Sequence, residues 1–173
     1  MKKIILTVAA VFAFGFANAQ DMKFGVKGGY INSNFGGDAD TDAKSSFYFG
    51  GLVDFTISEK FHIQPELLYS MEGADNDEAD LNFVRIPVMA KYYVAEGFNI
   101  QAGPQFGFVA GGGEIKELTK SFDYGLGLGA GYELTSGLFF DARYNFGLAN
   151  ISDMDGFDVN TTSFQIGLGY RFK

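Results

Sequence analysis

The sequence predicts an all-β fold, an eight-stranded antiparallel up-and-down transmembrane β-barrel with short turns at one end and longer loops at the other. Apolar and polar residues alternate over segments of about eleven residues, which is the pattern of a strand with two different faces. Eight such segments follow one another, and long and short connections alternate between them. The composition agrees, because 17% aromatic residues and 24 Gly in 173 residues are typical of a β protein with many tight turns.

The expected strands are 23–32, 47–57, 61–72, 81–94, 98–110, 122–134, 138–148 and 162–172. The last of them alternates most clearly, with Phe164, Ile166 and Leu168 on one face and Gln165 and Gly167 on the other. The short connections are Ser58–Lys60, Ala95–Gly97 and Thr135–Gly137, and the long ones cover about 33–46, 73–80, 111–121 and 149–161. In a barrel of this kind the short turns and both termini face the periplasm, and the long loops face outward.

Strand length favours a membrane over water. Eleven residues at about 3.3 Å each, tilted by about 45°, rise about 25 Å, the height of the apolar band on an outer-membrane barrel. Strands of soluble proteins average five or six residues. A sheet in lipid must close on itself, since lipid offers no hydrogen-bond partner to a free edge. Alternation alone does not say which face is inside, so a soluble lipocalin-like binding barrel, with apolar residues inward, is an alternative.

Residues 1–19 are predicted to be a cleaved signal peptide, and residues 20–173 to form one barrel domain. Lys2 and Lys3 precede an apolar run, and Ala17-Asn18-Ala19 provides small residues for cleavage. Without the leader, 11 basic and 21 acidic residues remain, a balance that argues against nucleic acid as a partner. The chain has no Cys, so neither a disulfide nor a lipid anchor on Cys is expected.

The stretch FDYGLGLGAGYEL (122–134) matches the loose pattern G-x-G-x-x-G/A at Gly125, Gly127 and Ala130, which can hold a dinucleotide pyrophosphate between a strand and a helix. Glycine recurs here at every second position, however, and no helical segment follows. We therefore interpret the stretch as a strand whose glycines face a narrow lumen and leave room for long side chains from other strands.

The same alternation places charged residues of both signs in the lumen, where they are expected to form a hydrogen-bonded ion-pair network that closes it. A charged filter of a pore is the functional alternative. The expected lumen residues are Lys27, Lys91, Arg143 and Arg171, with Arg85, and the acids Asp54, Glu66, Glu72, Asp123, Glu133 and Asp141.

No catalytic, cofactor-binding or metal site is predicted. His62 is the only histidine, and Ser70 lies eight residues further along the same strand, too far to act as its nucleophile. Asp38, Asp40 and Asp42 begin like a calcium loop, but Ala43 and Phe49 stand where glycine and glutamate are needed. We expect solvated acidic loops; incidental calcium binding, bridging lipopolysaccharide phosphates, is the alternative. The two further acidic groups are Asp75, Asp77, Glu78 and Asp80, and Asp153, Asp155 and Asp158.

Three prolines lie within predicted strands, at Pro65, Pro87 and Pro104, and we expect β-bulges there. The stretches IQPELLYS (63–70), RIPVMAKYY (85–93) and AGPQFGF (102–108), with FGVKGGYINSNF after the leader, resemble the PorT-like outer-membrane β-barrel family common in Bacteroidetes. The resemblance covers nearly the whole mature chain. It implies a small eight-stranded barrel in the outer membrane and offers no catalytic or binding residues.

The expected function is that of a small non-enzymatic outer-membrane barrel with a filled polar lumen. Its role would be structural or adhesive, through acidic extracellular loops. Its expected partners are outer-membrane lipid and lipopolysaccharide, and a protein bound by the loops; the barrel itself is expected to be a monomer. A lipid-modifying barrel enzyme is the enzymatic alternative, and it would need a His–Ser pair near the membrane rim.

Overall fold

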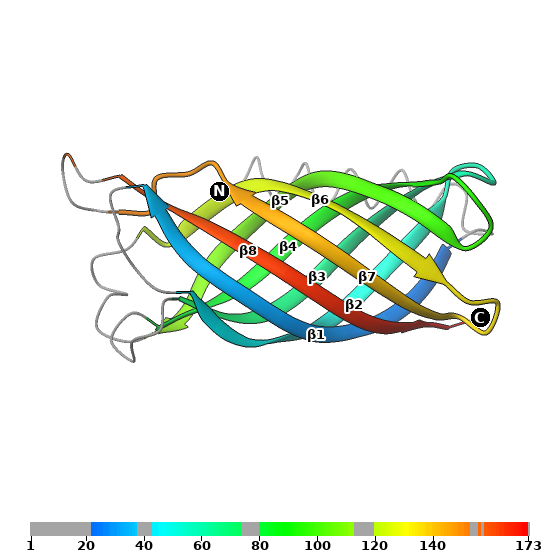
Figure 1. Cartoon of the computed structure of the whole chain (residues 1–173), viewed down its shortest axis with the longest axis horizontal. Coiled ribbons are helices and arrows are strands. Elements are labelled where there is room, and N and C mark those ends of the chain that lie inside the picture. The colour runs from blue at the N-terminus through cyan, green and yellow to red at the C-terminus, as the bar shows by residue number, and fades with distance from the viewer. Residues whose placement is uncertain are drawn as a thin grey trace.

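The strands of the chain form one closed barrel. The computed structural model describes residues 22–37, 43–73, 80–112, 120–152, 156 and 158–172. Each strand pairs antiparallel with its neighbours in sequence, and the last strand pairs with the first (Figure 1). The predicted fold class is therefore confirmed. The strands are β1 (Met22–Gly37), β2 (Lys44–Thr56), β3 (Phe61–Gly73), β4 (Asp80–Tyr93), β5 (Phe98–Gly112), β6 (Phe122–Glu133), β7 (Leu138–Gly147) and β8 (Val159–Arg171).

Several strands are longer than predicted, and the connections at one end are correspondingly shorter. β1 continues to Gly37 and β8 begins at Val159, and these two residues pair with each other. The added pairs are mostly polar, such as Asn34 with Thr162, and their apolar residues Phe35 and Val159 do not continue the apolar alternation of the outer face. Apolar alternation could not reveal them, because backbone pairing continues where the side chains no longer need to face lipid.

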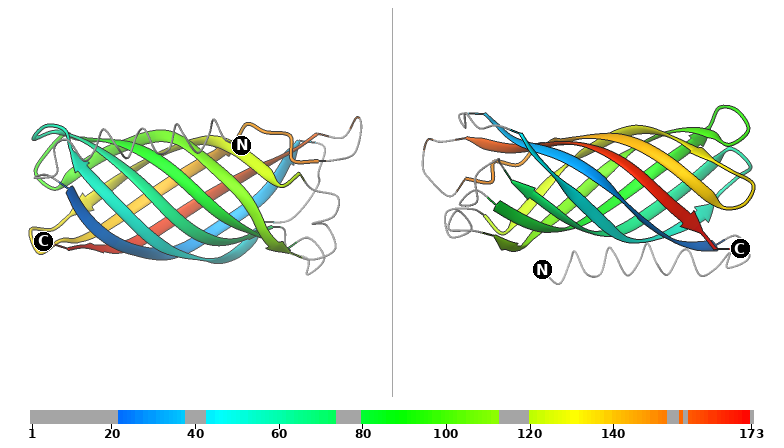
Figure 2. Two further views of the ribbon diagram at one scale, coloured as in Figure 1. Left: turned by 180° about the vertical axis from the view of Figure 1, so that it is seen from behind. Right: turned by 60° about the horizontal axis from the view of Figure 1, so that its bottom comes forward.

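Three tight turns join the strands at one end of the barrel, which we call the turn end; the opposite end is the loop end. Within the turns, Phe61 N–H donates to Ser58 O (3.2 Å), and Gly137 N–H donates to Leu134 O (2.9 Å). Gly97 and Gly137 have φ of 71° and 95°, a left-handed conformation that glycine adopts without strain. β1 begins and β8 ends at the turn end, and both views in Figure 2 show the same closed wall of tilted strands.

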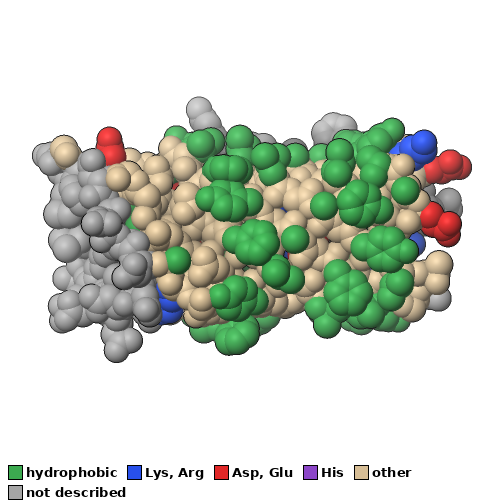
Figure 3. Space-filling view, in the orientation of Figure 1, with side chains coloured by type: hydrophobic (Ala, Val, Ile, Leu, Met, Phe, Trp, Pro, Cys, Tyr) green, Lys and Arg blue, Asp and Glu red, His purple; other side chains and the backbone are tan. Residues whose placement is uncertain are grey.

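The outer surface of the barrel is apolar and carries two belts of aromatic side chains (Figure 3). The belt at the turn end consists of Phe24, Phe61, Tyr92, Phe98, Tyr132, Phe140, Tyr170 and Phe172. The belt at the loop end consists of Tyr30, Phe47, Phe49, Tyr69, Phe106, Phe108, Phe122, Tyr124, Tyr144, Phe146 and Phe164. Aliphatic residues such as Val26, Ile100, Leu128 and Leu168 are exposed between them. An aliphatic band between two aromatic girdles is the surface of a barrel that spans a bilayer.

The expected bulges at the three prolines are wrong. The one register shift in the described ladders lies between Asn82 and Phe83, where β4 pairs with β5. Pro65, Pro87 and Pro104 each keep a paired residue in one neighbouring strand, respectively Val88, Gln105 and Leu126. In the ladder with the other neighbouring strand, each proline has no paired residue, but the register is the same before and after it. A proline removes one backbone donor, and this wall accommodates the loss without inserting a residue.

Candidate functional site

The lumen of the barrel contains the charged residues that the sequence places there. Ten of the eleven predicted side chains are buried, and the eleventh, Glu133, is 17% exposed at the turn end. The buried ones are Lys27, Arg85, Lys91, Arg143, Arg171, Asp54, Glu66, Glu72, Asp123 and Asp141. With polar residues inside and apolar residues outside, the lipocalin-like alternative is wrong.

An ion-pair cluster occupies the middle of the lumen. Arg143 on β7 donates to both carboxylate oxygens of Glu66 on β3 (2.8 and 3.1 Å) and to Gln101 Oε1 on β5 (3.0 Å). Lys27 Nζ on β1 lies 2.5 Å from Asp141 Oδ2 and 3.7 Å from Glu66 Oε2. Four strands thus share one network, and each of its charges faces an opposite charge, as a buried charge requires.

The glycines of β6 lie beside this cluster, since β6 pairs with β5 and β7 and Gly129 is paired with both Gln101 and Arg143. A Cβ atom at Gly127 would lie 2.9 Å from Asn145 Oδ1 and 3.3 Å from Arg143 Cδ. A Cβ at Gly129 would lie 2.4 Å from Ala142 O. Gly127 therefore leaves space for the Arg143 side chain, which comes from the neighbouring strand β7 and not from an opposite strand as expected. Because Gly125–Ala130 lies within β6, the stretch is a strand and not a phosphate-binding loop.

A second cluster lies nearer the loop end. Arg85 Nε and Nη2 donate to Glu72 Oε1 and Oε2 (2.9 and 2.6 Å), and Arg85 Nη1 also bonds Asp123. Neutral donors complete the set, since Ser70 Oγ donates to Glu72 Oε1 (2.5 Å) and Thr161 Oγ1 to Asp123 Oδ2 (2.9 Å). Arg85 is thus the centre of this cluster.

Apolar side chains separate and cover the two clusters. Ile31, Tyr48 and Leu68 form a buried group that lies between them along β1 and β3. A larger group closes the loop end, and it consists of Phe35, Leu81, Phe83, Ala149 and Ile151. The lumen is therefore occupied by side chains from its middle to the loop end, with polar and apolar layers in turn.

The β7–β8 connection contributes to this closure, although the sequence predicted only a solvated loop there. Ile151 is 2% exposed. Its N–H donates to Val159 O, and its carbonyl accepts a hydrogen bond from Lys120 N–H; the N···O distance is 2.8 Å in both bonds. A single large aliphatic residue in a polar segment was the available signal. It was too weak to show that the segment turns back into the barrel.

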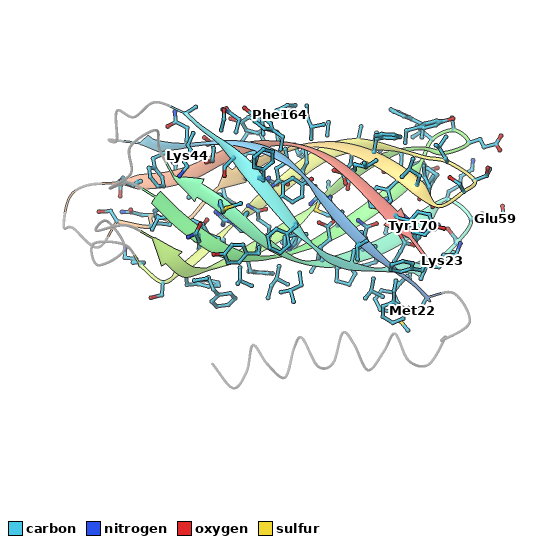
Figure 4. The ribbon with its side chains drawn as sticks, turned by 90° about the horizontal axis from the view of Figure 1, so that it is seen from below. Met22, Lys23, Lys44, Glu59, Phe164 and Tyr170 are labelled. Atoms are coloured by element: carbon cyan, nitrogen blue, oxygen red, sulfur yellow. The ribbon has the colours of Figure 1, made fainter. Side chains whose placement is uncertain are left out.

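The turn end is open and contains a cavity of about 320 Å³, which we call the turn-end cavity. It is lined in part by Lys23, Glu59, His62, Tyr93, Glu133 and Arg171, and Figure 4 shows Lys23 and Glu59 at this end. Asp54 lies at its base, with His62 Nδ1 2.6 Å from Asp54 Oδ1 and Arg171 Nη2 3.1 Å from Asp54 Oδ2. Arg171 Nη1 also lies 2.8 Å from Glu133 Oε2, to which the Tyr93 hydroxyl donates over 2.7 Å.

The His–Ser pair required by the lipid-modifying alternative is not formed. His62 is paired with Asp54 at the turn end, whereas Ser70 bonds Glu72 in the loop half of the lumen. Among the described residues, no group of three or more His, Cys, Asp or Glu side chains could hold a metal ion.

The acidic loop groups lie mostly outside the described residues, and this includes Asp38, Asp40, Asp42, Asp75, Asp77, Glu78, Asp153 and Asp155. Asp158 is described; it is exposed and bonds Asn150. The calcium alternative is therefore untested at these groups.

The fold and the filled lumen define a small transmembrane β-barrel. The chain belongs to the family of the outer membrane protein beta-barrel domain, whose model matches residues 4–172, and it is located in the outer membrane. No curated protein matches the sequence. No helix in the described part of the chain is long and apolar enough to cross a membrane.

Two solved structures illustrate the shared fold. The attachment invasion locus protein Ail of Yersinia pestis is 15% identical, with a TM-score of 0.56, over 88% of this chain and 100% of Ail. Neisserial surface protein A is 15% identical, with a TM-score of 0.57, over 86% of this chain and 97% of that protein. Ail has also been solved with the heparin analogue sucrose octasulfate. That structure is 16% identical to this chain, with a TM-score of 0.52, over 88% of this chain and 100% of Ail. At these identities the likeness shows the fold alone.

Proposed function

We propose that this protein is a non-enzymatic, non-conducting outer-membrane scaffold that acts through its loop-end connections, in a structural or adhesive role. The filled lumen is the observation that carries the proposal. Ion pairs occupy its middle, and the apolar group around Phe83 and Ile151 closes the loop end. Such an interior leaves no continuous column of water for solutes, so interactions have to be made by the surface of the barrel.

The charge of the loops indicates the kind of partner. The segments 38–42, 75–80 and 153–158 together contain ten acidic and no basic residues. Ail has been solved with a sulfated sugar, but a polyanion would be repelled by these loops. We therefore propose a basic protein surface as the partner, with lipid and lipopolysaccharide around the barrel. The resemblance of stretches such as RIPVMAKYY (85–93) to PorT-like proteins supports a place in that subgroup, and residues 1–19 are proposed to be a cleaved leader.

A conductance measurement tests the closed lumen. The mature chain, reconstituted in a planar bilayer, should give no large and steady channel, because the ion pairs and the apolar group block the path. A stable ohmic conductance from the unmodified protein would refute a scaffold with a closed interior.

A pull-down from native outer membranes tests the acidic loops. The bait is compared with a variant in which Asp38, Asp40 and Asp42 are asparagine, and with a matched control, Glu59→Gln at the turn end. We expect the loop variant to lose a basic partner and the control to retain it. Retention by both variants at equal yield would show that these loop charges do not bind the partner.

A further inference from the structure

The turn-end cavity is independent of the loops, and its inner wall has an unusual balance of donors and acceptors. The donors of three side chains on this wall, His62, Tyr93 and Arg171, are occupied, whereas Lys23 stands at the exposed rim. The His62 Nδ1–H donates to Asp54, the Tyr93 hydroxyl to Glu133, and the Arg171 guanidinium is paired with Asp54 and Glu133. Arg171 Nε has no hydrogen-bond partner among the described residues, but it is inaccessible and cannot reach a ligand.

Two acceptors remain on this wall. Both bonds to Glu133 are made to Oε2, so Oε1 has no donor among the described residues. The Asp54 carboxylate is held by Arg171 and can only accept, so it fixes the His62 proton on Nδ1. In the neutral ring, Nε2 is then an acceptor, and no described residue donates to it.

The surroundings of these acceptors favour a cation with an alkyl group. Glu59 and Glu96 lie in the rim with Lys23, so the rim has an excess of one negative charge, and Arg171 is already neutralised by its carboxylates. Leu134 and Phe172 border the mouth of the same cavity, and their side chains are exposed beside it. The His62 ring lies 4.8 Å from the Tyr93 ring, a contact that orients Nε2.

We propose that the turn-end cavity binds a primary ammonium group, carried by a small amine or by a lysine side chain. The ammonium donates to Glu133 Oε1 and His62 Nε2, and its alkyl stem extends toward the mouth of the cavity, which Leu134 and Phe172 border. An ammonium supplies three donors and a positive charge, which matches the two free acceptors, Glu133 Oε1 and His62 Nε2, beside the occupied donors of Tyr93 and Arg171. A volume of 320 Å³ accommodates such a group with a few carbons and several waters.

His62 provides a direct reporter, because it is the only histidine in the chain. The folded mature chain, labelled with ¹⁵N-histidine in detergent micelles at about pH 8.5, is titrated with ethylammonium chloride. An alkylammonium remains charged at that pH. We expect a saturable shift of the Nε2 resonance, and no such shift with tetramethylammonium chloride, which has the same charge but no N–H donor.

Variants and a second probe complete the test. Glu133→Gln should weaken ethylammonium binding about tenfold or more, while the matched control Asp158→Asn at the loop end should leave it unchanged. Titration with Nα-acetyl-lysine methylamide separates the sources: tighter binding than ethylammonium indicates a lysine of a protein, and equal or weaker binding a free amine. Equal, unsaturable shifts with ethylammonium and tetramethylammonium, or no shift with either, would overturn the proposal without needing any variant to fold.

Discussion

Replacing Arg143 by methionine measures how much the ion pairs in the middle of the lumen stabilise the barrel. Arg143 is 1% exposed and makes three hydrogen bonds, two to Glu66 and one to Gln101. Methionine keeps much of the side-chain volume but none of these bonds. Glu66 then remains as a buried carboxylate whose nearest cation, Lys27 Nζ, is 3.7 Å away and lies 2.5 Å from Asp141.

The expected cost follows from this stranded charge. Removing one partner of a buried ion pair destabilises a protein by about 3–5 kcal/mol. Gln64 still donates to Glu66 Oε1 over 2.7 Å, so we expect a value near the lower limit, about 3 kcal/mol. Adding Glu66→Gln removes the stranded charge, and the double variant should be more stable than Arg143→Met alone. The two changes should thus be coupled by about 2 kcal/mol.

Equilibrium unfolding in urea, with the chain in lipid vesicles, gives the free energies. The folded fraction is read from gel mobility, since a closed barrel that has not been boiled migrates differently from the unfolded chain. Lys60→Met is the control, because Lys60 is exposed in a turn and its loss should cost less than about 0.5 kcal/mol. If Arg143→Met is no more destabilising than this control, or if the double variant costs the sum of its parts, the ion pairs do not stabilise the lumen as argued.

Three further predictions use simpler measurements. Gly127→Leu should destabilise the barrel by about 1–3 kcal/mol in the same urea assay, because a side chain there meets Asn145 and Arg143; an unchanged midpoint would contradict the filled lumen. Protease added to intact cells should cut at the loop end, for example within 38–42, and cleavage confined to the turn at 57–60 would reverse the orientation. Sequencing of the mature chain should find Gln20 first, and a retained Met1 would refute the leader.

The sequence predicted the fold and the inward residues because both depend on one local property. In a strand, successive side chains point to opposite faces, so an apolar face that meets lipid also determines which residues line the lumen. Lys27, Glu66 and Arg143 could therefore be placed inside without knowing any contact. Their partners could not be predicted, because the pairing of Arg143 with Glu66 depends on how β7 and β3 are staggered around the closed barrel.

Other features depend on tertiary packing that alternation does not encode. The largely polar ends of β1 and β8 pair although no apolar alternation marks them, and Ile151 turns into the barrel mouth from a segment that carries several acidic residues. Sequence reasoning about Pro87 failed for a related reason. The missing donor was noted correctly, but only the neighbouring strands determine whether the ladder inserts a residue or omits a pair.

The polar lumen also explains how the chain selects this arrangement over others. A slip of the strand phase by one residue would turn the lumen charges toward lipid and the aromatic belts inward. Each exposed Arg or Lys in the middle of the bilayer costs about 2–4 kcal/mol, so exposing Arg143 and Lys27 alone would offset much of a barrel's stability. The narrow lumen could not hold the belts in exchange, because the Gly127 and Gly129 wall is already in contact with Arg143 and Asn145. The ion pairs thus determine which face of each strand points into the lumen and which faces lipid, even where their net contribution to stability is modest. The coupling free energy between Arg143 and Glu66 measures the contribution to stability separately.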